Sequence, residues 1–172
     1  MVVVKTPSYN NNYNSRTITV VKIILPIKEE IYMRKLYISN GIDTSPEKTA
    51  LIGDFCNFCA SHLPISGDFE VFVVSDRDAH DISTTAAYHR GDGIIKVYGR
   101  NRALVDILRS IAHELTHLKQ DEQGELVGII QDAGGEIEDE ANARAGEIIK
   151  LFAKSAPDRV RIYESIARKN IL

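Results

Sequence analysis

Residues 102–120 carry the hydrophobic pattern that most restricts how this chain can fold. Apolar side chains recur there every three or four residues, which is the spacing of one face of an α-helix. They are Leu104, Leu108, Ile111, Leu115 and Leu118, with Ile107 beside them. A helix with such a stripe has to bury that face. We therefore expect a helix over residues 102–120 that packs on the core and leaves its other side polar.

The polar side of this helix carries two histidines and a glutamate. His113 and His117 are four residues apart, so a helix places them on one face, about 40° apart around its axis. Both imidazoles can then reach one metal ion, and Glu114 lies close enough to activate a water molecule there. This H-E-x-x-H spacing indicates a zinc site, although five residues alone also fit an ordinary amphipathic helix with an exposed polar face.

A catalytic zinc ion needs three protein ligands and an open position for water. No histidine follows His117 at a short spacing, so we expect a carboxylate from a second helix, predicted over about residues 135–153. Helical phase separates three candidates. Glu136 and Glu140 point about 160° away from Glu138, towards solvent. Glu138 instead shares a face with the residues that this helix would turn inwards: Ala141, Ala145, Ile149 and Phe152. Glu138 is therefore the predicted third ligand.

Two further features accompany this candidate. Asn142 lies four residues after Glu138 on the same face, where its side-chain oxygen could accept the second ring N–H of a zinc-bound histidine and fix that ring. Residues 121–140 contain eight acidic and no basic residues. They could help to capture a cation, but we interpret them as a solvated surface loop.

The two segments together resemble the gluzincin metallopeptidases. The resemblance rests on His113-Glu-Leu-Thr-His117, twenty intervening residues and Glu138-Asp-Glu-Ala-Asn142, and it covers about residues 84–153. The chain looks most similar to compact forms, such as the proteases that cleave phage repressors and the small metallopeptidases of bacteriophage genomes. The resemblance implies a zinc-dependent peptidase with Zn²⁺ held by both histidines and Glu138, and with Glu114 as general base. One departure is Asn142, where thermolysin-like enzymes carry aspartate.

The segment before the motif helix reads as a β-hairpin, with strands at 86–89 and Gly93–Gly99. The resemblance implies that Gly93–Gly99 borders the cleft and that a peptide or protein substrate pairs with its free edge. Tyr88, His89 and Tyr98 are candidates for stabilising the tetrahedral oxyanion, and nothing in the sequence ranks them.

Cys56 and Cys59 form a Cys-x-x-Cys pattern, with His62 three residues further on. A redox pair or a second metal site would be the functional interpretation. However, both cysteines fall within a helix predicted over about residues 47–63, on or near its apolar stripe, with Ser45 as its N-cap and Pro46 as its first residue. A redox motif would instead open a helix after a strand. Since cysteine is among the most buried residue types, we interpret both as core residues.

The whole chain predicts one compact α+β domain. We expect residues 1–32 to form a partly flexible N-terminal extension and residues 33–172 to form a zincin-like domain. Its small, twisted, mostly antiparallel sheet would pack on the motif helix and the third-ligand helix. Further strands are expected at 17–26, 34–39 and 69–75, and a short helix after Pro157 to about Lys169. Translation could start at Met1 or at Met33.

Composition narrows the functional classes. A formal net charge of −3 argues against a general nucleic-acid binder, and no apolar run approaches the roughly 20 residues that span a membrane. Two cysteines and no secretory signal predict a cytoplasmic protein, in the host cytoplasm if the gene is phage-encoded.

The alternative function is a catalytically silent, zinc-stabilised protein-binding module, for example a phage regulator of a host protein. Glu114 argues against it, because a structural zinc site has no use for a general base. Substrate and oligomeric state are left open.

Overall fold

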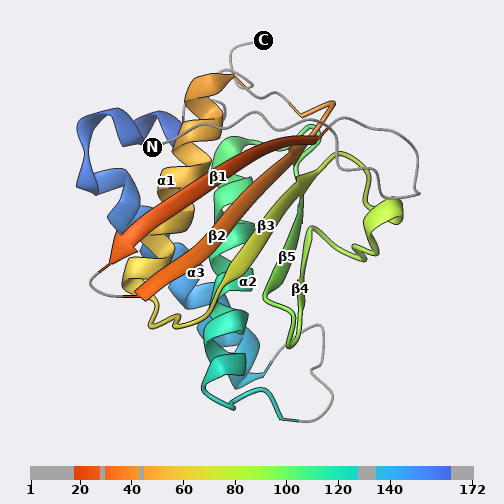
Figure 1. Ribbon diagram of the computed structural model, residues 1–172, viewed down its shortest axis with the longest axis vertical. Coiled ribbons are helices and arrows are strands. Elements are labelled where there is room, and N and C mark those ends of the chain that lie inside the picture. Colours follow the sequence, from red (N-terminus) through yellow and green to blue (C-terminus); the bar gives the residue numbers. More distant parts are fainter. Residues whose placement is uncertain (1–17, 28–29, 43–44, 128–134, 164–172) are drawn as a thin grey trace.

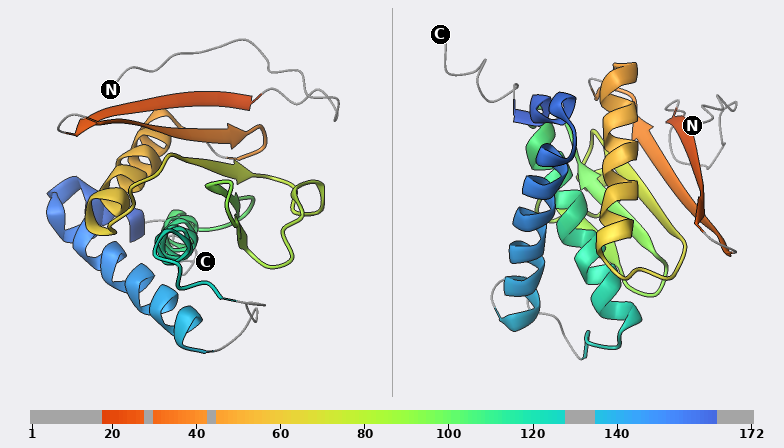
Figure 2. Two further views of the ribbon diagram at one scale, coloured as in Figure 1. Left: turned by 60° about the horizontal axis from the view of Figure 1, so that its bottom comes forward. Right: turned by 90° about the vertical axis from the view of Figure 1, so that its left-hand side faces the viewer.

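The computed structural model describes residues 18–27, 30–42, 45–127 and 135–163 (Figure 1). A five-stranded sheet has the order β1-β2-β3-β5-β4, and the helices lie against one of its faces (Figure 2). The strands are β1 (Ile18–Ile27), β2 (Glu30–Ser39), β3 (Phe69–Val74), β4 (Ala86–His89) and β5 (Ile94–Tyr98). The helices are α1 (Pro46–His62), α2 (Leu104–Glu122) and α3 (Glu136–Ser155), with short 3₁₀ helices η1 (Asp78–His80) and η2 (Pro157–Tyr163). The described chain is thus a mixed α/β fold.

The sheet is evenly mixed, so the expectation of a mostly antiparallel sheet was wrong. β2 pairs with β3, and β3 with β5, in parallel, whereas β1–β2 and β4–β5 are antiparallel. The physical reason is the crossover through α1: a strand, a helix and a second strand in one sheet form a βαβ unit, whose strands run parallel. The parallel strands are therefore central and the antiparallel strands form both edges.

The expected domain boundary between residues 32 and 33 falls within β2. β1, which belongs to the expected extension, pairs with β2 from Ile18–Ser39 to Ile27–Glu30. The final short helix is found as η2, and residues 164–169 of that prediction lie outside the described residues.

The strand Gly93–Gly99 has no free edge. Its regular part, β5, is paired on one side with β3 and on the other with β4. Ile95 and Val97 on this strand are completely buried. The hairpin turn before it contains Gly93 at φ +64°, where a Cβ atom would come within 2.7 Å of the Asp68 carbonyl oxygen. The hairpin thus places β4, rather than β5, at the edge of the sheet.

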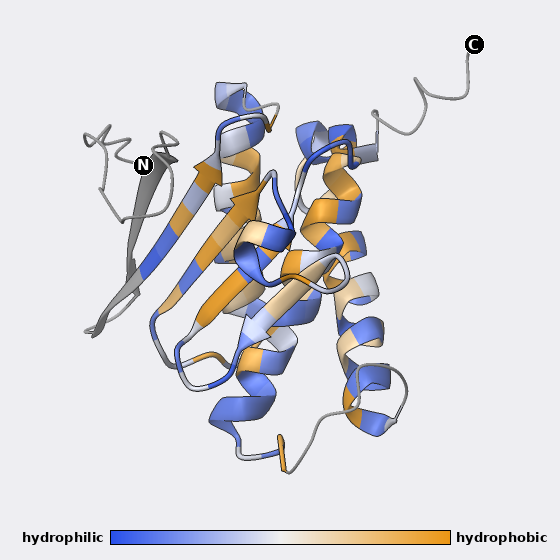
Figure 3. Cartoon of the chain, turned by 90° about the vertical axis from the view of Figure 1, so that its right-hand side faces the viewer, coloured by the Kyte–Doolittle hydropathy of each residue, from blue (hydrophilic) through white to orange (hydrophobic). Residues whose placement is uncertain are grey.

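Helix α2 occupies the centre of the helical layer, because it contacts α1, α3, β4 and β5. Its predicted apolar stripe is buried, except that Leu104 is only partly buried. Figure 3 shows hydrophobic and hydrophilic residues alternating within the elements, as amphipathic strands and helices require. Among the described residues, no helix combines the length and the apolar character that a membrane-crossing segment needs.

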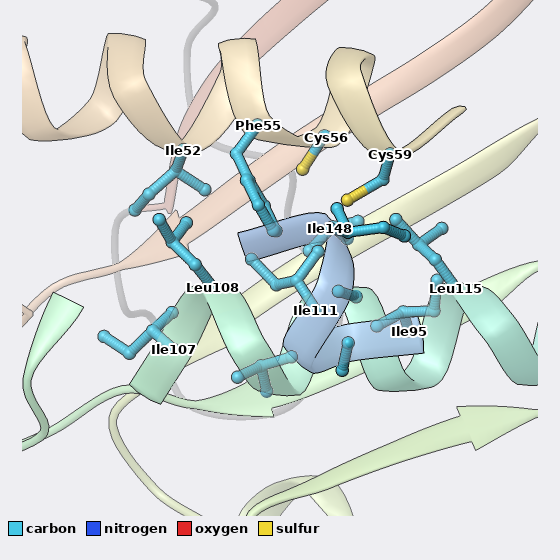
Figure 4. Packing of buried hydrophobic residues seen from close by; sticks show 14 of the residues in the cluster. Ile52, Phe55, Cys56, Cys59, Ile95, Ile107, Leu108, Ile111, Leu115 and Ile148 are labelled. Carbon is cyan, nitrogen blue, oxygen red and sulfur yellow. The ribbon is translucent and has the colours of Figure 1, made fainter. Parts of the chain in front are cut away.

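Helix α1 begins where the sequence predicts. The Ser45 hydroxyl accepts a hydrogen bond from the Lys48 N–H (3.3 Å), and Pro46 is the first helical residue. Cys56 and Cys59 project from α1 into the core, towards α2 (Figure 4). Both are free and buried, and burial raises the pKa of the Cys56 thiol to about 12. The interpretation of these cysteines as core residues is confirmed.

Candidate metal centre

The packing of α3 against α2 brings His113, His117 and Glu138 together. One ligand atom from each side chain lies within 4.8 Å of the others. The two histidine Nε2 atoms are 3.0 Å apart, and the Glu138 carboxylate oxygens are 3.3 Å from Nε2 of His113 and 3.1 Å from Nε2 of His117. Among the described residues, this is the one group of three or more such side chains that could hold a metal ion.

These separations fit a tetrahedral zinc ion. Ligand atoms about 2.0–2.1 Å from zinc at tetrahedral angles are about 3.3 Å from one another. The spacings of 3.0–3.3 Å in the structure are close to that value. Small side chains allow the close approach, because Ala141 and Ala145 on the inner face of α3 are almost completely buried. The choice of Glu138 by helical phase agrees with this geometry.

Gln120 fixes the orientation of His117, and the sequence reasoning missed it. Its side chain is completely buried. Its amide nitrogen donates to the Ile137 carbonyl (3.1 Å) and to Glu140 (2.9 Å), so its amide oxygen faces Nδ1 of His117 at 2.8 Å. Nδ1 therefore carries the proton and Nε2 presents its lone pair to the site. The spacing of three residues from His117, which places both side chains on one helix face, is the signal that could have found Gln120.

Glu140 was expected to point to solvent, and its side chain is 35% exposed, but it also contacts α2. Its carboxylate accepts hydrogen bonds from Gln120 and from Lys119 (3.2 Å), and these bonds hold the pKa of Glu140 below its usual value. Helical phase alone missed these contacts because α2 runs beside the first turn of α3. Glu136 is exposed, as predicted.

Asn142 lies beside His113 in the lining of an adjoining pocket, and a side-chain hydrogen bond with it favours the protonated form of His113. Burial lowers the pKa of His113, and the neighbouring His117 ring lowers it further. Glu138 and Asn142 act in the opposite direction but do not reverse the shift. His113 is therefore held in the neutral form that binds metals. Imidazole lone pairs and carboxylate oxygens at about 3 Å repel one another unless a cation lies among them, so the donor set fits a metal ion.

Glu114 lies beside these ligands and is only 8% exposed. Burial and the negative charge of Glu138 raise its pKa to about 8, although the backbone N–H of Tyr88 donates a hydrogen bond to its carboxylate. A carboxyl group with a pKa near neutrality can both accept and release a proton, which general acid–base chemistry requires.

The edge strand β4 borders a cleft of about 230 Å³ at this site. Its lining includes Ala86 and Tyr88 from β4 and the side chains of His113, Glu114 and Glu138. The Tyr98 N–H donates to the Thr85 carbonyl (2.9 Å), so the antiparallel ladder directs the backbone groups of Ala86 and Tyr88 away from β5. The backbone groups of Ala86 and Tyr88 therefore point to the free edge of β4, where the Tyr88 N–H donates to Glu114.

The structure separates the three candidates for oxyanion stabilisation. Tyr88 lines the cleft, but its hydroxyl donates to Asp121 (2.7 Å). His89 has a buried Nε2 with no hydrogen-bond partner among the described residues, and it does not line the cleft. Tyr98 lines a different pocket, together with Arg77 and Arg100. None of the three hydroxyl or imidazole groups is thus positioned as a free donor in this cleft.

The acidic segment is less solvated than expected. Asp121 accepts hydrogen bonds from Tyr88, Arg90 (3.0 Å) and the Gly91 N–H (3.0 Å). Glu122 accepts bonds from Ser66 and from the Gly67 N–H. Both carboxylates therefore attach the end of α2 to neighbouring turns. Residues 128–134 of the segment lie outside the described residues.

No protein-family model matches the chain, no curated protein matches it, and no solved structure matches it.

Proposed function

We propose that the chain is a zinc-dependent metallopeptidase of the gluzincin type. The observation that carries the proposal is the convergence of His113, His117 and Glu138 beside the buried Glu114 in a cleft below an edge strand. Two histidines and one carboxylate form a ligand set that suits zinc and leaves a coordination position open. When bound, zinc supplies Lewis acidity towards a carbonyl group and makes water nucleophilic near neutral pH.

Glu114 is the proposed general base. Its carboxylate accepts a proton from the attacking water and delivers it to the leaving amine. Burial beside Glu138 sets its proton affinity, and the Tyr88 N–H holds its orientation. Gln120 and Asn142 keep both imidazoles directed towards the metal position.

A peptide or protein substrate binds as an additional strand on β4. This replaces the expected pairing with Gly93–Gly99, whose strand already has two neighbours. The Ala86 N–H and the carbonyl groups of Ala86 and Tyr88 point to the free side of β4 and can form main-chain hydrogen bonds with an extended peptide. Main-chain pairing accepts many sequences, so a substrate class is not implied by β4 alone.

The test compares zinc content and peptide hydrolysis in wild type, Glu114→Gln and Glu136→Gln. Wild type is expected to bind one zinc ion and to cleave members of a broad peptide library. Glu114→Gln should keep the zinc and lose hydrolysis by roughly 10²- to 10⁴-fold. Glu136, exposed on the first turn of α3, is the matched control and should change neither property.

Two results would contradict the proposal. Wild type that binds zinc but is as inert as Glu114→Gln would favour the protein-binding module. Hydrolysis that survives unchanged in Glu114→Gln would remove this residue from the reaction.

A further inference from the structure

A second pocket, of about 280 Å³, adjoins the metal centre. It shares His113, Glu114 and Thr84 with the cleft below β4, so the two hollows meet at the candidate ligand and the general base. Its walls also contain two arginines, Arg102 just before α2 and Arg109 within α2. We refer to this hollow as the arginine pocket.

Arg102 is fixed in the wall of the arginine pocket. Its guanidinium donates to the carbonyl oxygens of Tyr98 (2.9 Å) and Asp106 (2.9 Å), to that of Thr85 (3.4 Å) and to the Ser110 hydroxyl (3.0 Å). All of these acceptors are neutral. Burial lowers the pKa of Arg102, and the nearby Asp106 acts in the opposite direction. Arg102 thus contributes a fixed positive charge without donors to spare at its two terminal nitrogens.

Arg109 lies one helical turn before His113 and is exposed. Its guanidinium makes no hydrogen bond or ion pair with any other residue in the part of the chain that the structure describes. It lines the same pocket as His113, so its positive charge lies close to the site. Arg109 therefore has all of its donors available to a molecule that enters the pocket.

Asp106 also lines the arginine pocket and offsets part of this charge. It is exposed, and no ion pair joins it to Arg102 or to Arg109. The lining therefore contains two guanidinium groups and two carboxyl groups, those of Asp106 and Glu114, and the unused donors of Arg109 are what it offers to an anion. A carboxylate is the group that a planar guanidinium with free donors binds best.

We infer that the arginine pocket binds a carboxylate of the substrate, next to the scissile bond, through Arg109. The inference rests on the proposed peptidase function and specifies its substrate class: peptides with an acidic residue, or with the C-terminal carboxylate, at that position. Thr84 and Thr85 directly precede β4. A substrate strand antiparallel to β4 would therefore present its residue on the C-terminal side of the scissile bond to this pocket.

The test uses zinc-loaded protein and pairs of internally quenched peptides that differ only by glutamate or glutamine at one position. A series of such pairs places the glutamate or glutamine at each position in turn on either side of the cleaved bond. Wild type is expected to prefer glutamate by roughly tenfold or more in kcat/KM at one position, the scale of a charged hydrogen bond. Arg109→Gln should abolish that preference. Arg109→Glu should instead prefer a third peptide that carries lysine at the same position. Arg161→Gln, another exposed arginine and outside both pockets, is the matched control.

A second pair of peptides separates the two sources of a carboxylate. Peptides that end in a free acid or in an amide at the same distance from the cleaved bond identify recognition of the C-terminus. A preference for the free acid that depends on Arg109, without a glutamate preference, assigns the pocket to the C-terminal carboxylate.

Binding is measured in parallel by fluorescence anisotropy, using labelled peptides and the zinc-loaded Glu114→Gln variant. This readout does not require hydrolysis. Equal affinities for all paired peptides, or a preference that survives Arg109→Gln, would overturn the inference. If Glu114-dependent hydrolysis is observed alongside such a result, the peptidase function stands and only the carboxylate specificity fails.

Discussion

The amide oxygen of Gln120 lies 2.8 Å from Nδ1 of His117. The same side chain bonds the Ile137 carbonyl and Glu140 through its amide nitrogen. One buried amide thus connects the second histidine of α2 to the first turn of α3, which carries Glu138. The orientation of the His117 ring and the position of α3 are therefore coupled.

Replacement of Gln120 by leucine should weaken zinc binding by roughly 10- to 100-fold, because the His117 ring loses the acceptor that holds it. The measurement is competition with a chromophoric chelator. Gln123→Leu is the control, since Gln123 is exposed at the end of α2. Equal zinc affinities for wild type and Gln120→Leu would show that Gln120 has no orienting role.

Three alanine variants on α3 are expected to differ in zinc affinity in a fixed order. Glu138→Ala removes a proposed ligand and should lose the most. Glu140→Ala removes the partner of Gln120 and should lose less, and Glu136→Ala should match wild type. Metal analysis after dialysis, followed by chelator competition, gives the order. Retained zinc in Glu138→Ala together with loss in Glu140→Ala would reverse the ligand assignment.

Removal of zinc should destabilise the fold, because the lone pairs that converge between α2 and α3 lose the cation among them. At free zinc of about 100 times Kd, the gain in unfolding free energy should be about 2.7 kcal/mol. Urea unfolding with and without zinc measures it. Glu138→Ala should show little of this gain. A wild-type stability independent of zinc would contradict specific binding.

Asp121→Asn should reduce stability at neutral pH by about 1–3 kcal/mol, through the loss of charged hydrogen bonds. Burial raises the pKa of Asp121, but the bonds from Tyr88, Gly91 and Arg90 outweigh that effect, so its pKa lies below 3.8. Its contribution is therefore complete above about pH 4 and is lost as the pH falls through the lowered value. Urea unfolding at several pH values should show wild type and variant converging only below about pH 4.

The two thiols should be unreactive in the native protein. Burial raises the pKa of both Cys56 and Cys59, and reaction requires an exposed thiolate. A colourimetric thiol reagent should therefore detect two thiols in denaturant and almost none without it. Addition of zinc to the native protein should leave this result unchanged. Rapid native reaction that zinc blocks would instead support a metal site at these cysteines.

The sequence predicted the elements well because their signals are local. The apolar stripe of α2, the Ser45–Pro46 start of α1 and the phase of Glu138 on α3 each depend on one segment. The direction of the central strands depends on how α1 crosses the sheet, so periodicity within a strand could not reveal it. The roles of Gln120 and Glu140 arise only where two helices meet. The βαβ order was nevertheless visible in the sequence and predicts parallel strands.

The three bonds that Asp121 accepts from the β4–β5 hairpin have a consequence for how a substrate would be positioned. They attach the edge strand and its turn to the same helix that carries the candidate metal ligands His113 and His117. A peptide paired with β4 would then meet the proposed catalytic centre at a constant register. The location of the cut along a substrate would be set by hydrogen-bond spacing, and side-chain recognition would decide only which sequences are cut.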